Sequence, residues 1–465
     1  MLYKGAHDPC VLIQCVLVGL ELLLDAASPS AFDNSAERFD PPKCYPNTRT
    51  AILTEIMDWI VGKIGWERYI MWLYGPAGAG KSAIAQTIAE LCRAKGILLA
   101  SFFFSRSDPK RNNVRPLAAS LAYQVTVNVP EARRPIESVV ENDPAIFQQS
   151  FQAQFNSLIV DPLRHINKLF NAIPYFIIID GLDECADANV QRHILETAAT
   201  LSSDKNFIPL TFMFSSRAER AISLTFSTSL FQGVTARIAL DDTYRSEADI
   251  RIYLEGSFSE IKKTHLQKGL IPRTWPEADD ISLLVDKSSG QFIYATTVIR
   301  YISSSRYKPM ISLEIILGLR PARGGAPFAE LDVLYGDVLS RAEDTSATLQ
   351  LLGAIIHLKG GDNLKFLEKF LFLDEGDVVR LLADVSSLVA IAPHPYRESA
   401  YNIRFLHASF GDFLLDPDRS QEYHINPATT CTELVFIGLR HVEQYTCLAG
   451  YWPIKCHATP CKSHR

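Results

Sequence analysis

The feature that most constrains this chain is the stretch from Tyr69 to Ser82, YIMWLYGPAGAGKS. Its apolar first half predicts a buried strand, and the eight residues that follow fit the phosphate-binding pattern G-x-x-x-x-G-K-[ST] without a gap. Glycines let consecutive backbone N–H groups point at one anion, and the helix predicted over 83–92 adds the positive end of its dipole. A strand, such a loop and a helix in this order predict an α/β fold that binds a phosphorylated ligand.

The motif gives each of its residues an expected role. The backbone of the loop would hold the phosphates, the Lys81 ammonium would reach the β- and γ-phosphates, and the Ser82 hydroxyl would bind Mg²⁺. The expected phosphate-binding residues are Gly75, Pro76, Ala77, Gly78, Ala79, Gly80, Lys81 and Ser82.

Residues 175–185, YFIIIDGLDEC, predict the second part of the site. An apolar strand ends at Asp180, so its carboxylate is expected at the C-terminal edge of a parallel sheet, where such sheets bind ligands. We predict that Asp180 serves the Mg²⁺ shell and that Asp183 and Glu184 orient or deprotonate the attacking water.

Strands and helices alternate from about residue 69 to 240, which predicts a three-layer parallel α/β domain. Arg217 follows one of these strands at the same sheet edge, where it would sense or neutralise a γ-phosphate; a surface arginine at a strand end is the alternative. The predicted strands are 69–74, 97–105, 175–180, 207–216 and 234–240.

The pattern changes after residue 241, where helical periodicity replaces the alternation. The segment RPARGGAP at 320–327 predicts a linker. Beyond it, predicted helices precede two short strand candidates, 389–393 and 403–406, and this order is typical of a winged-helix module. The predicted helices are 248–261, 279–289, 292–303, 331–341, 347–358, 366–372 and 374–388.

Composition and the two ends of the sequence restrict partners and location. The net charge is −6 and Lys and Arg form no basic stripe, so nucleic acid is not expected as the main partner. The apolar run 11–24 is too short for a membrane span and predicts a buried helix, with a signal peptide as the alternative. Residues 28–46, rich in Ser, Asp, Asn and Pro, predict a linker. The nine irregularly spaced cysteines indicate a reduced, cytoplasmic protein, and the Cys- and His-containing tail at 456–464 lacks the spacing of a zinc site.

Several segments between about residues 40 and 425 match one family in order: DPPKCYPNTR (40–49), GPAGAGKS (75–82), ASFFFSR (100–106), FIIIDGLDEC (176–185), FSSRAE (214–219), GQFIYATTVIRYI (290–302), LYGDVL (334–339) and FLHASFGDFLLD (405–416). Together they resemble the NACHT-type P-loop NTPases of the STAND class, and among these the fungal NLR-like proteins with a nephrocystin-like NTPase domain.

The resemblance implies a signal-transduction switch that binds ATP or ADP with Mg²⁺ and hydrolyses ATP slowly. It further implies self-association on activation and effector proteins as partners, in fungal non-self recognition or cell death. The implied division is an N-terminal helix and linker (1–40), a NACHT P-loop NTPase domain (41–240), a helical domain (241–325), a winged-helix domain (326–425) and a C-terminal tail (426–465) that begins a further region.

Three further site residues come from the resemblance alone. Thr48 and Arg49 match the family's segment beside the adenine, and His407 matches a winged-helix histidine that reaches the β-phosphate of ADP; a core histidine is the alternative for His407. The family's Gly-x-Pro is here Gly290-Gln291-Phe292. Two other functions remain open: a conventional catalyst with rapid turnover, such as an ATPase or a kinase, and a scaffold in which ADP is structural.

Overall fold

The computed structural model describes residues 19–38, 41–62, 68–106, 108–167, 175–202, 210–240, 246–303, 308–318, 328–358, 363–393 and 401–448. The chain divides into two compact units, one of Met1–Leu331 with His407–Ser409 and the other of Asp332–Leu406 with Phe410–Arg465. The predicted linker at 320–327 and the Cys- and His-containing tail at 456–464 lie outside the described residues. In the part of the chain that is described, none of the helices combines the length and the apolar character that a membrane span needs.

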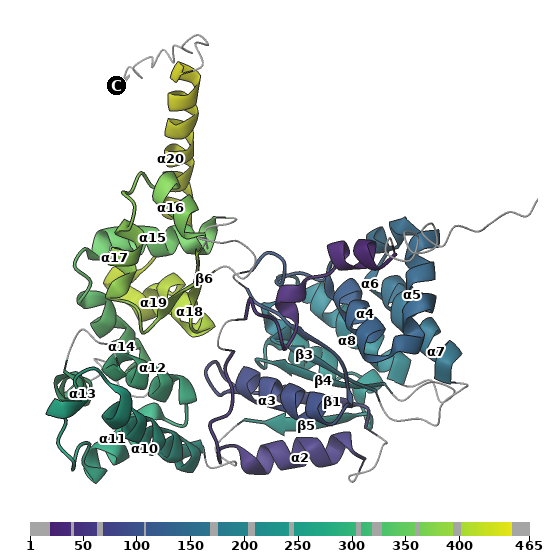
Figure 1. Ribbon diagram of the computed structural model, residues 1–465, viewed down its shortest axis with the longest axis horizontal. Coiled ribbons are helices and arrows are strands. Elements are labelled where there is room, and N and C mark those ends of the chain that lie inside the picture. The colour runs from purple at the N-terminus through teal and green to yellow at the C-terminus, as the bar shows by residue number, and fades with distance from the viewer. Residues whose placement is uncertain are drawn as a thin grey trace, which may run out of the picture. The chain divides into compact units, whose positions relative to one another are not determined.

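A five-stranded sheet organises the first unit (Figure 1). Its strand order is β2-β3-β4-β1-β5, and every neighbouring pair is parallel. The strands are β1 (Ile70–Tyr74), β2 (Leu98–Phe103), β3 (Tyr175–Asp180), β4 (Leu210–Ser216) and β5 (Thr235–Ala239). The predicted parallel α/β domain is therefore confirmed, and its central strands are buried because helices cover both faces.

Along β1, β3 and β4, and at the end of β2, successive residues enter two different cores. Phe102 of β2 packs in one core with helices on one face of the sheet, whereas Phe103 packs in the other core with residues of the helix after the phosphate-binding loop. The helices of this part are α2 (Thr50–Ile60), α3 (Lys81–Ala94), α4 (Leu117–Asn128), α5 (Pro130–Asn142), α6 (Phe151–Phe155), α7 (Asp161–Asn167), α8 (Ala188–Ser202) and α9 (Arg220–Phe226). Single-turn elements are η1 (Pro29–Ala31), η2 (Pro144–Gln148), the π-helical η3 (Asn156–Val160), η4 (Leu182–Glu184) and η5 (Ser229–Phe231).

The first unit continues with a helical part. Its elements are α10 (Ser246–Thr264), η7 (Lys268–Leu270), α11 (Ala278–Ser288), α12 (Phe292–Ser303) and α13 (Pro309–Gly318). The three predicted helices of this stretch are confirmed, with ends that differ by a few residues.

The second unit combines helices with one small sheet. Its helices are α14 (Ala329–Ser340), α15 (Thr345–His357), α16 (Leu364–Phe370), α17 (Asp377–Ala383), α18 (Ala408–Leu415), α19 (Pro417–Ser420), η8 (Gln421–Tyr423) and α20 (Pro427–Leu448). The first residues of α14 and α18 belong to the first unit. β6 (Val389–Pro393) and β7 (Tyr401–Phe405) pair antiparallel, as the two strand candidates predict. The helix predicted over 374–388 is shorter than expected, because Gly376 adopts φ 95° before α17 and residues 384–388 form turns that lead into β6.

The linker prediction is wrong for the described residues 28–38. Ser28, Ser30, Asp33 and Arg38 are buried in the first unit, and the preceding residues 19–26 form a helix whose Leu23 is fully buried. The sequence pattern misled because these polar side chains find partners inside the protein, whereas a linker of the same composition would be solvated.

Candidate nucleotide-binding site

Glycine is favoured at three positions of the phosphate-binding loop. Gly78 and Gly80 adopt φ 75° and 93°, in the left-handed region that favours glycine. A methyl group at Gly78 would overlap the side chain of Ile293, and one at Gly75 would lie 2.9 Å from Cβ of Leu240. The loop thus has left-handed backbone conformations at Gly78 and Gly80 and packs closely against Ile293 and Leu240. Both properties suit a preformed anion-binding turn.

Two carbonyl groups of the loop are held by residues distant in sequence. Nη2 of Arg49 donates to the Ala79 carbonyl oxygen at 3.0 Å, and the Ile293 amide donates to that of Gly78 at 3.3 Å. Arg49 is itself anchored, since its amide donates to Asp249 at 3.0 Å and its guanidinium lies 4.9 Å from the ring centroid of Phe292. Burial lowers the pKa of Arg49, and the charge of Asp249 acts in the opposite direction. These contacts fix two carbonyl oxygens of the loop, whose N–H groups are the expected anion donors.

Thr48 and Arg49 lie side by side before α2. The Thr48 hydroxyl donates to the Tyr45 carbonyl oxygen at 2.7 Å, and both residues are buried. The structure therefore places Arg49 against the phosphate-binding loop, while the place of both residues beside an adenine stays a prediction.

Lys81 and Ser82 begin α3 directly after the loop. Lys81 Nζ donates to the carbonyl oxygens of Gly75 at 2.9 Å and Pro76 at 2.8 Å, so its ammonium lies over the loop. Burial lowers the pKa of Lys81, and among the charges around it Asp183 contributes most to raising it. A cation is thus held at the position where the motif predicts contact with the β- and γ-phosphates.

Asp180 ends β3 beside the start of α3. It is buried, its Oδ1 accepts a hydrogen bond from the Ser215 hydroxyl, and the Ser82 hydroxyl lies near enough to influence its pKa. Burial raises the pKa of Asp180, whereas the Ser215 and Ser82 hydroxyls and the charges of Arg38 and Lys81 lower it. The structure brings together Ser82 and Asp180, the two residues predicted to hold Mg²⁺.

Asp183 and Glu184 have different partners, although the sequence predicts one shared role for them. Asp183 accepts a hydrogen bond from the Arg217 amide at 3.0 Å and forms an ion pair with Arg217 Nε at 3.2 Å. Glu184 accepts a hydrogen bond from the Arg106 amide at 2.9 Å, and burial above all raises its pKa to about 7. Asp183 therefore orients Arg217, and Glu184 has the pKa of a group that can take up a proton near neutral pH.

His407 lies against α12. Its Nε2 is 3.4 Å from the Thr296 hydroxyl oxygen, and desolvation, followed by the charge of Arg300, lowers its pKa to about 3. The imidazole is thus neutral at physiological pH. Its predicted contact with a β-phosphate stays a prediction.

The donor set fits Mg²⁺ bound together with a nucleotide. Among the described residues, no group of three or more His, Cys, Asp or Glu side chains could hold a metal ion alone. Mg²⁺ at phosphate sites takes one or two protein ligands and fills its shell with phosphate oxygens and water, so the Ser82 hydroxyl beside Asp180 is a suitable set.

Sequence reasoning missed several residues that build this site. Ser215 lies two residues before Arg217, so the strand that delivers the arginine also indicated a hydroxyl at the sheet edge. Ile293, Asp249 and Arg38 carry no comparable signal, because each reaches the site only through the tertiary fold.

Comparison with known proteins agrees with the nucleotide-binding geometry. Residues 48–217 match the family model described as Nephrocystin 3, N-terminal, a range that contains the phosphate-binding loop and Asp180. None of the curated proteins compared with the chain matches it. Similar solved structures include a Walker-type ATPase of Pyrococcus abyssi, 11% identical, which covers 80% of this chain and 97% of its own with a TM-score of 0.39.

Two further solved structures are also similar. The ORC1 protein of Aeropyrum pernix, solved in complex with DNA, is 14% identical and covers 79% of this chain and 92% of its own with a TM-score of 0.38. AMPPCP-bound DnaA of Aquifex aeolicus is 13% identical and covers 77% and 91% with a TM-score of 0.30. With scores this low, the assignment depends on the family match, the parallel sheet and the loop, and these show that the chain contains a P-loop NTPase domain.

Proposed function

We propose that this protein is a nucleotide-operated switch that binds ATP or ADP with Mg²⁺ and hydrolyses ATP slowly. The observation that carries the proposal is the proximity of Ser82 and Asp180 beside a loop in which Gly78 and Gly80 adopt left-handed conformations. The proposed site combines the Ser82 hydroxyl, the Asp180 carboxylate and the Lys81 ammonium around one turn suited to an anion. Such a set serves a nucleotide polyphosphate better than any other common ligand.

Each residue of the site has a separate proposed role in phosphate binding, Mg²⁺ binding or hydrolysis. Lys81 and the loop amides would bind the phosphates, and Ser82 and Asp180 would hold Mg²⁺, which supplies charge neutralisation at the phosphate oxygens when bound. Glu184 would accept the proton of the attacking water, and Arg217, oriented by Asp183, would stabilise the charge on the γ-phosphate. Because the pKa of Glu184 is about 7, much of it is protonated at neutral pH, which suits slow turnover.

The finer assignment is part of this proposal. It identifies the chain as a fungal NACHT-type NTPase of the cytoplasm that self-associates on activation and engages effector proteins. Support comes from the ordered family segments and from the antiparallel β6–β7 pair that follows α15 to α17, an order typical of a winged helix. The same proposal includes the division into domains at 41–240, 241–325 and 326–425. It also includes contacts of Thr48 and Arg49 with the adenine and of His407 with the nucleotide.

Nucleic acid is not proposed as the main partner. The net charge of −6 supplies no general field that would attract a polyanion. The DNA named with the Aeropyrum pernix structure is a ligand of that protein.

The nucleotide carried by the purified protein tests the proposal first. The protein would be denatured, the released nucleotide identified by chromatography, and a second aliquot assayed for steady-state ATP hydrolysis. Stoichiometric ADP with slow turnover and measurable exchange supports the switch. An empty site with many turnovers per second supports a conventional enzyme, and ADP that never exchanges supports a structural role. Complete reversal of a two-state equilibrium from 1:99 to 99:1 needs about 5.5 kcal/mol of differential affinity, so ATP and ADP should differ measurably in their effects.

A further inference from the structure

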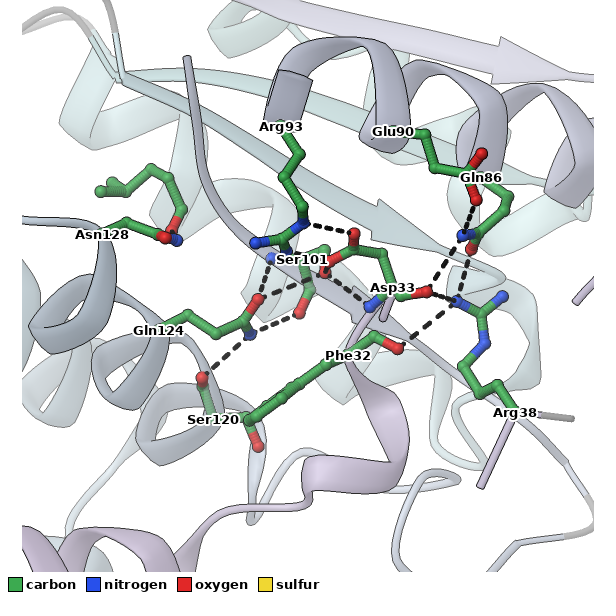
Figure 2. Close-up of polar contacts among 11 residues, drawn as sticks. Phe32, Asp33, Arg38, Gln86, Glu90, Arg93, Ser101, Ser120, Gln124 and Asn128 are labelled. Atoms are coloured by element: carbon green, nitrogen blue, oxygen red, sulfur yellow. Dashed lines mark hydrogen bonds and ion pairs between the residues drawn. The ribbon is translucent and has the colours of Figure 1, made fainter. Parts of the chain in front are cut away.

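The residues before the phosphate-binding loop contain a buried polar network, which the proposed function does not use. We call residues 28–38 the N-terminal segment. Figure 2 shows its Asp33 between Arg93 of α3 and Ser101 of β2, and its Arg38 beside Gln86 of α3. The segment therefore contacts the helix that begins at the loop and the strand next to β3.

Asp33 forms the first anchor of the segment. Its carboxylate accepts hydrogen bonds from Arg93 Nε at 3.0 Å, Arg93 Nη2 at 2.6 Å and the Ser101 hydroxyl at 2.7 Å, and its side chain is 1% exposed. The Asp33 amide donates back to the Ser101 hydroxyl oxygen at 3.0 Å. A buried carboxylate is costly unless it is paired and hydrogen-bonded, and here both conditions are met.

The same network covers the outer edge of β2, which is an edge strand of the sheet. The Gln124 side chain accepts from the Ser101 amide at 3.0 Å and donates to the Ser101 carbonyl oxygen at 2.8 Å, so one amide side chain replaces a neighbouring strand. Asn128 donates to the Leu99 carbonyl oxygen at 2.7 Å. These contacts fix the edge of the sheet at the strand that carries Phe103.

Arg38 forms the second anchor and lies nearer to the candidate site. Its Nη1 donates to Gln86 Oε1 at 2.7 Å, its guanidinium carbon lies 3.7 Å from the ring centroid of Phe103, and the residue is 8% exposed. A planar guanidinium can stack on a ring and donate in its own plane at once, which a lysine ammonium cannot do.

The partners of Arg38 are adjacent to the predicted Mg²⁺ ligands. Gln86 follows Ser82 by four residues on α3 and so lies on the same face about one turn further. Phe103 is paired with Asp180 in the register of β2 and β3. Arg38 thus connects the helix that carries Ser82 to the strand beside Asp180.

We propose that Arg38 is a positioning residue of the nucleotide site, which sets the place of Ser82 relative to Asp180 through Gln86 and Phe103. The inference rests on the proposed nucleotide-binding function. A fraction of an ångström between two metal ligands changes metal affinity strongly, and outer partners of such ligands typically change it 10–100-fold. Loss of Arg38 should therefore raise the Mg²⁺ concentration that nucleotide binding requires, in addition to any loss of stability.

The test compares Arg38→Ala with the matched control Arg93→Ala. Both arginines connect the N-terminal segment to α3, but Arg93 lies about three turns from Ser82. Binding of a fluorescent ADP analogue would be titrated with Mg²⁺ for each full-length variant, beside thermal unfolding without nucleotide. We expect Arg38→Ala to raise the Mg²⁺ concentration for half-maximal binding about tenfold. Arg93→Ala should leave it within about twofold, although both variants lower the unfolding temperature. Arg38→Lys should recover only part of the loss.

The outcomes separate this inference from the proposed function. A wild-type protein that binds no nucleotide overturns the proposed function itself. If the wild type binds and the two alanine variants shift the Mg²⁺ requirement equally, or neither shifts it, the positioning role is wrong. Should Arg38→Ala fail to fold, Gln86→Met removes the acceptor of Arg38 within α3 and must show the same shift in Mg²⁺ requirement.

Discussion

The phosphate-binding loop and the N-terminal segment both contact α3, but they depend on opposite properties of the chain. The loop depends on missing side chains, since a methyl group at Gly78 would overlap Ile293, and on residues adjacent in sequence. The N-terminal segment depends on side chains that are present and far apart, such as Asp33 and Ser101, which are 68 positions apart. Chemistry at a ligand can therefore be local in sequence, while the framework that fixes its geometry is not.

The largest expected effect is a loss of nucleotide affinity on removal of Lys81, a residue of the loop and not of the N-terminal segment. Lys81→Ala removes the ammonium that lies over the loop, and we expect nucleotide affinity to fall about 10³-fold, or about 4 kcal/mol, with little loss of stability. Lys95→Ala, at the exposed C-terminal end of the same helix, is the matched control and should bind normally. Calorimetric titration with ADP and Mg²⁺ measures both. Equal binding by the two variants would remove the phosphate-binding role of the loop.

Glu184→Gln tests the hydrolysis step and leaves the N-terminal segment unchanged. We expect turnover to fall about 10²-fold while ATP stays bound, because the amide cannot take a proton from water. Asp187→Asn, a nearby exposed carboxylate, should leave turnover unchanged. Single-turnover hydrolysis with retention of labelled ATP measures the effect, and rapid hydrolysis by Glu184→Gln would assign the base elsewhere.

The pH dependence of the same group has a defined sign. The pKa of Glu184 is raised from 4.5 to about 7, chiefly by burial, so wild-type turnover should increase as pH rises through about 7. The folded protein binds this proton more tightly than the unfolded chain. The stability that Glu184 contributes is therefore fully present below about pH 4.5 and is lost as pH rises through about 7. Both dependences should flatten in Glu184→Gln, as pH-rate profiles and denaturation at several pH values would show.

Sequence reasoning worked where the signal was local. The run from Tyr69 to Ser82 contained a strand, a turn and a helix start with motif residues, and the structure has β1 and α3 there. Asp180 was placed at a strand end by the apolar residues before it, and the parallel sheet puts it beside Ser82. Continuous apolar runs likewise predicted the five strands, since strands buried on both faces contain few polar residues.

It failed where burial of polar residues depends on distant partners. Residues 28–38 have the composition of a linker, and nothing in them indicates that Arg93, Ser101 and Gln86 will satisfy their polar groups. The unequal roles of Asp183 and Glu184 were missed for a similar reason. Arg217 pairs with Asp183, and the Arg106 amide donates to Glu184, only once the sheet has folded.

Two glycines of the loop differ in their surroundings, since Gly78 packs against Ile293 and Gly80 faces open space. Both have positive φ, but a methyl group at Gly78 overlaps Ile293, whereas nothing lies within 4 Å of one at Gly80. We expect Gly80→Ala to cost about 1 kcal/mol of unfolding free energy from backbone strain alone and Gly78→Ala about 1 kcal/mol more from the overlap. Urea denaturation measures both, and equal losses would show that the contact with Ile293 does not constrain the loop.

The smallest expected effect on nucleotide affinity lies in the N-terminal segment. Asp33→Asn keeps the shape of the side chain but replaces one carboxylate oxygen by a donor that faces Arg93 and Ser101. We expect a loss of about 1.5 kcal/mol of unfolding free energy, and nucleotide affinity within about twofold of wild type, because the contacts of Arg38 remain. Asp25→Asn, on the exposed side of the preceding helix, is the control and should be neutral. Urea denaturation beside ADP titration separates the two quantities. If Asp33→Asn weakened binding as strongly as Lys81→Ala, the division between ligand chemistry in the loop and framework in the N-terminal segment would be lost.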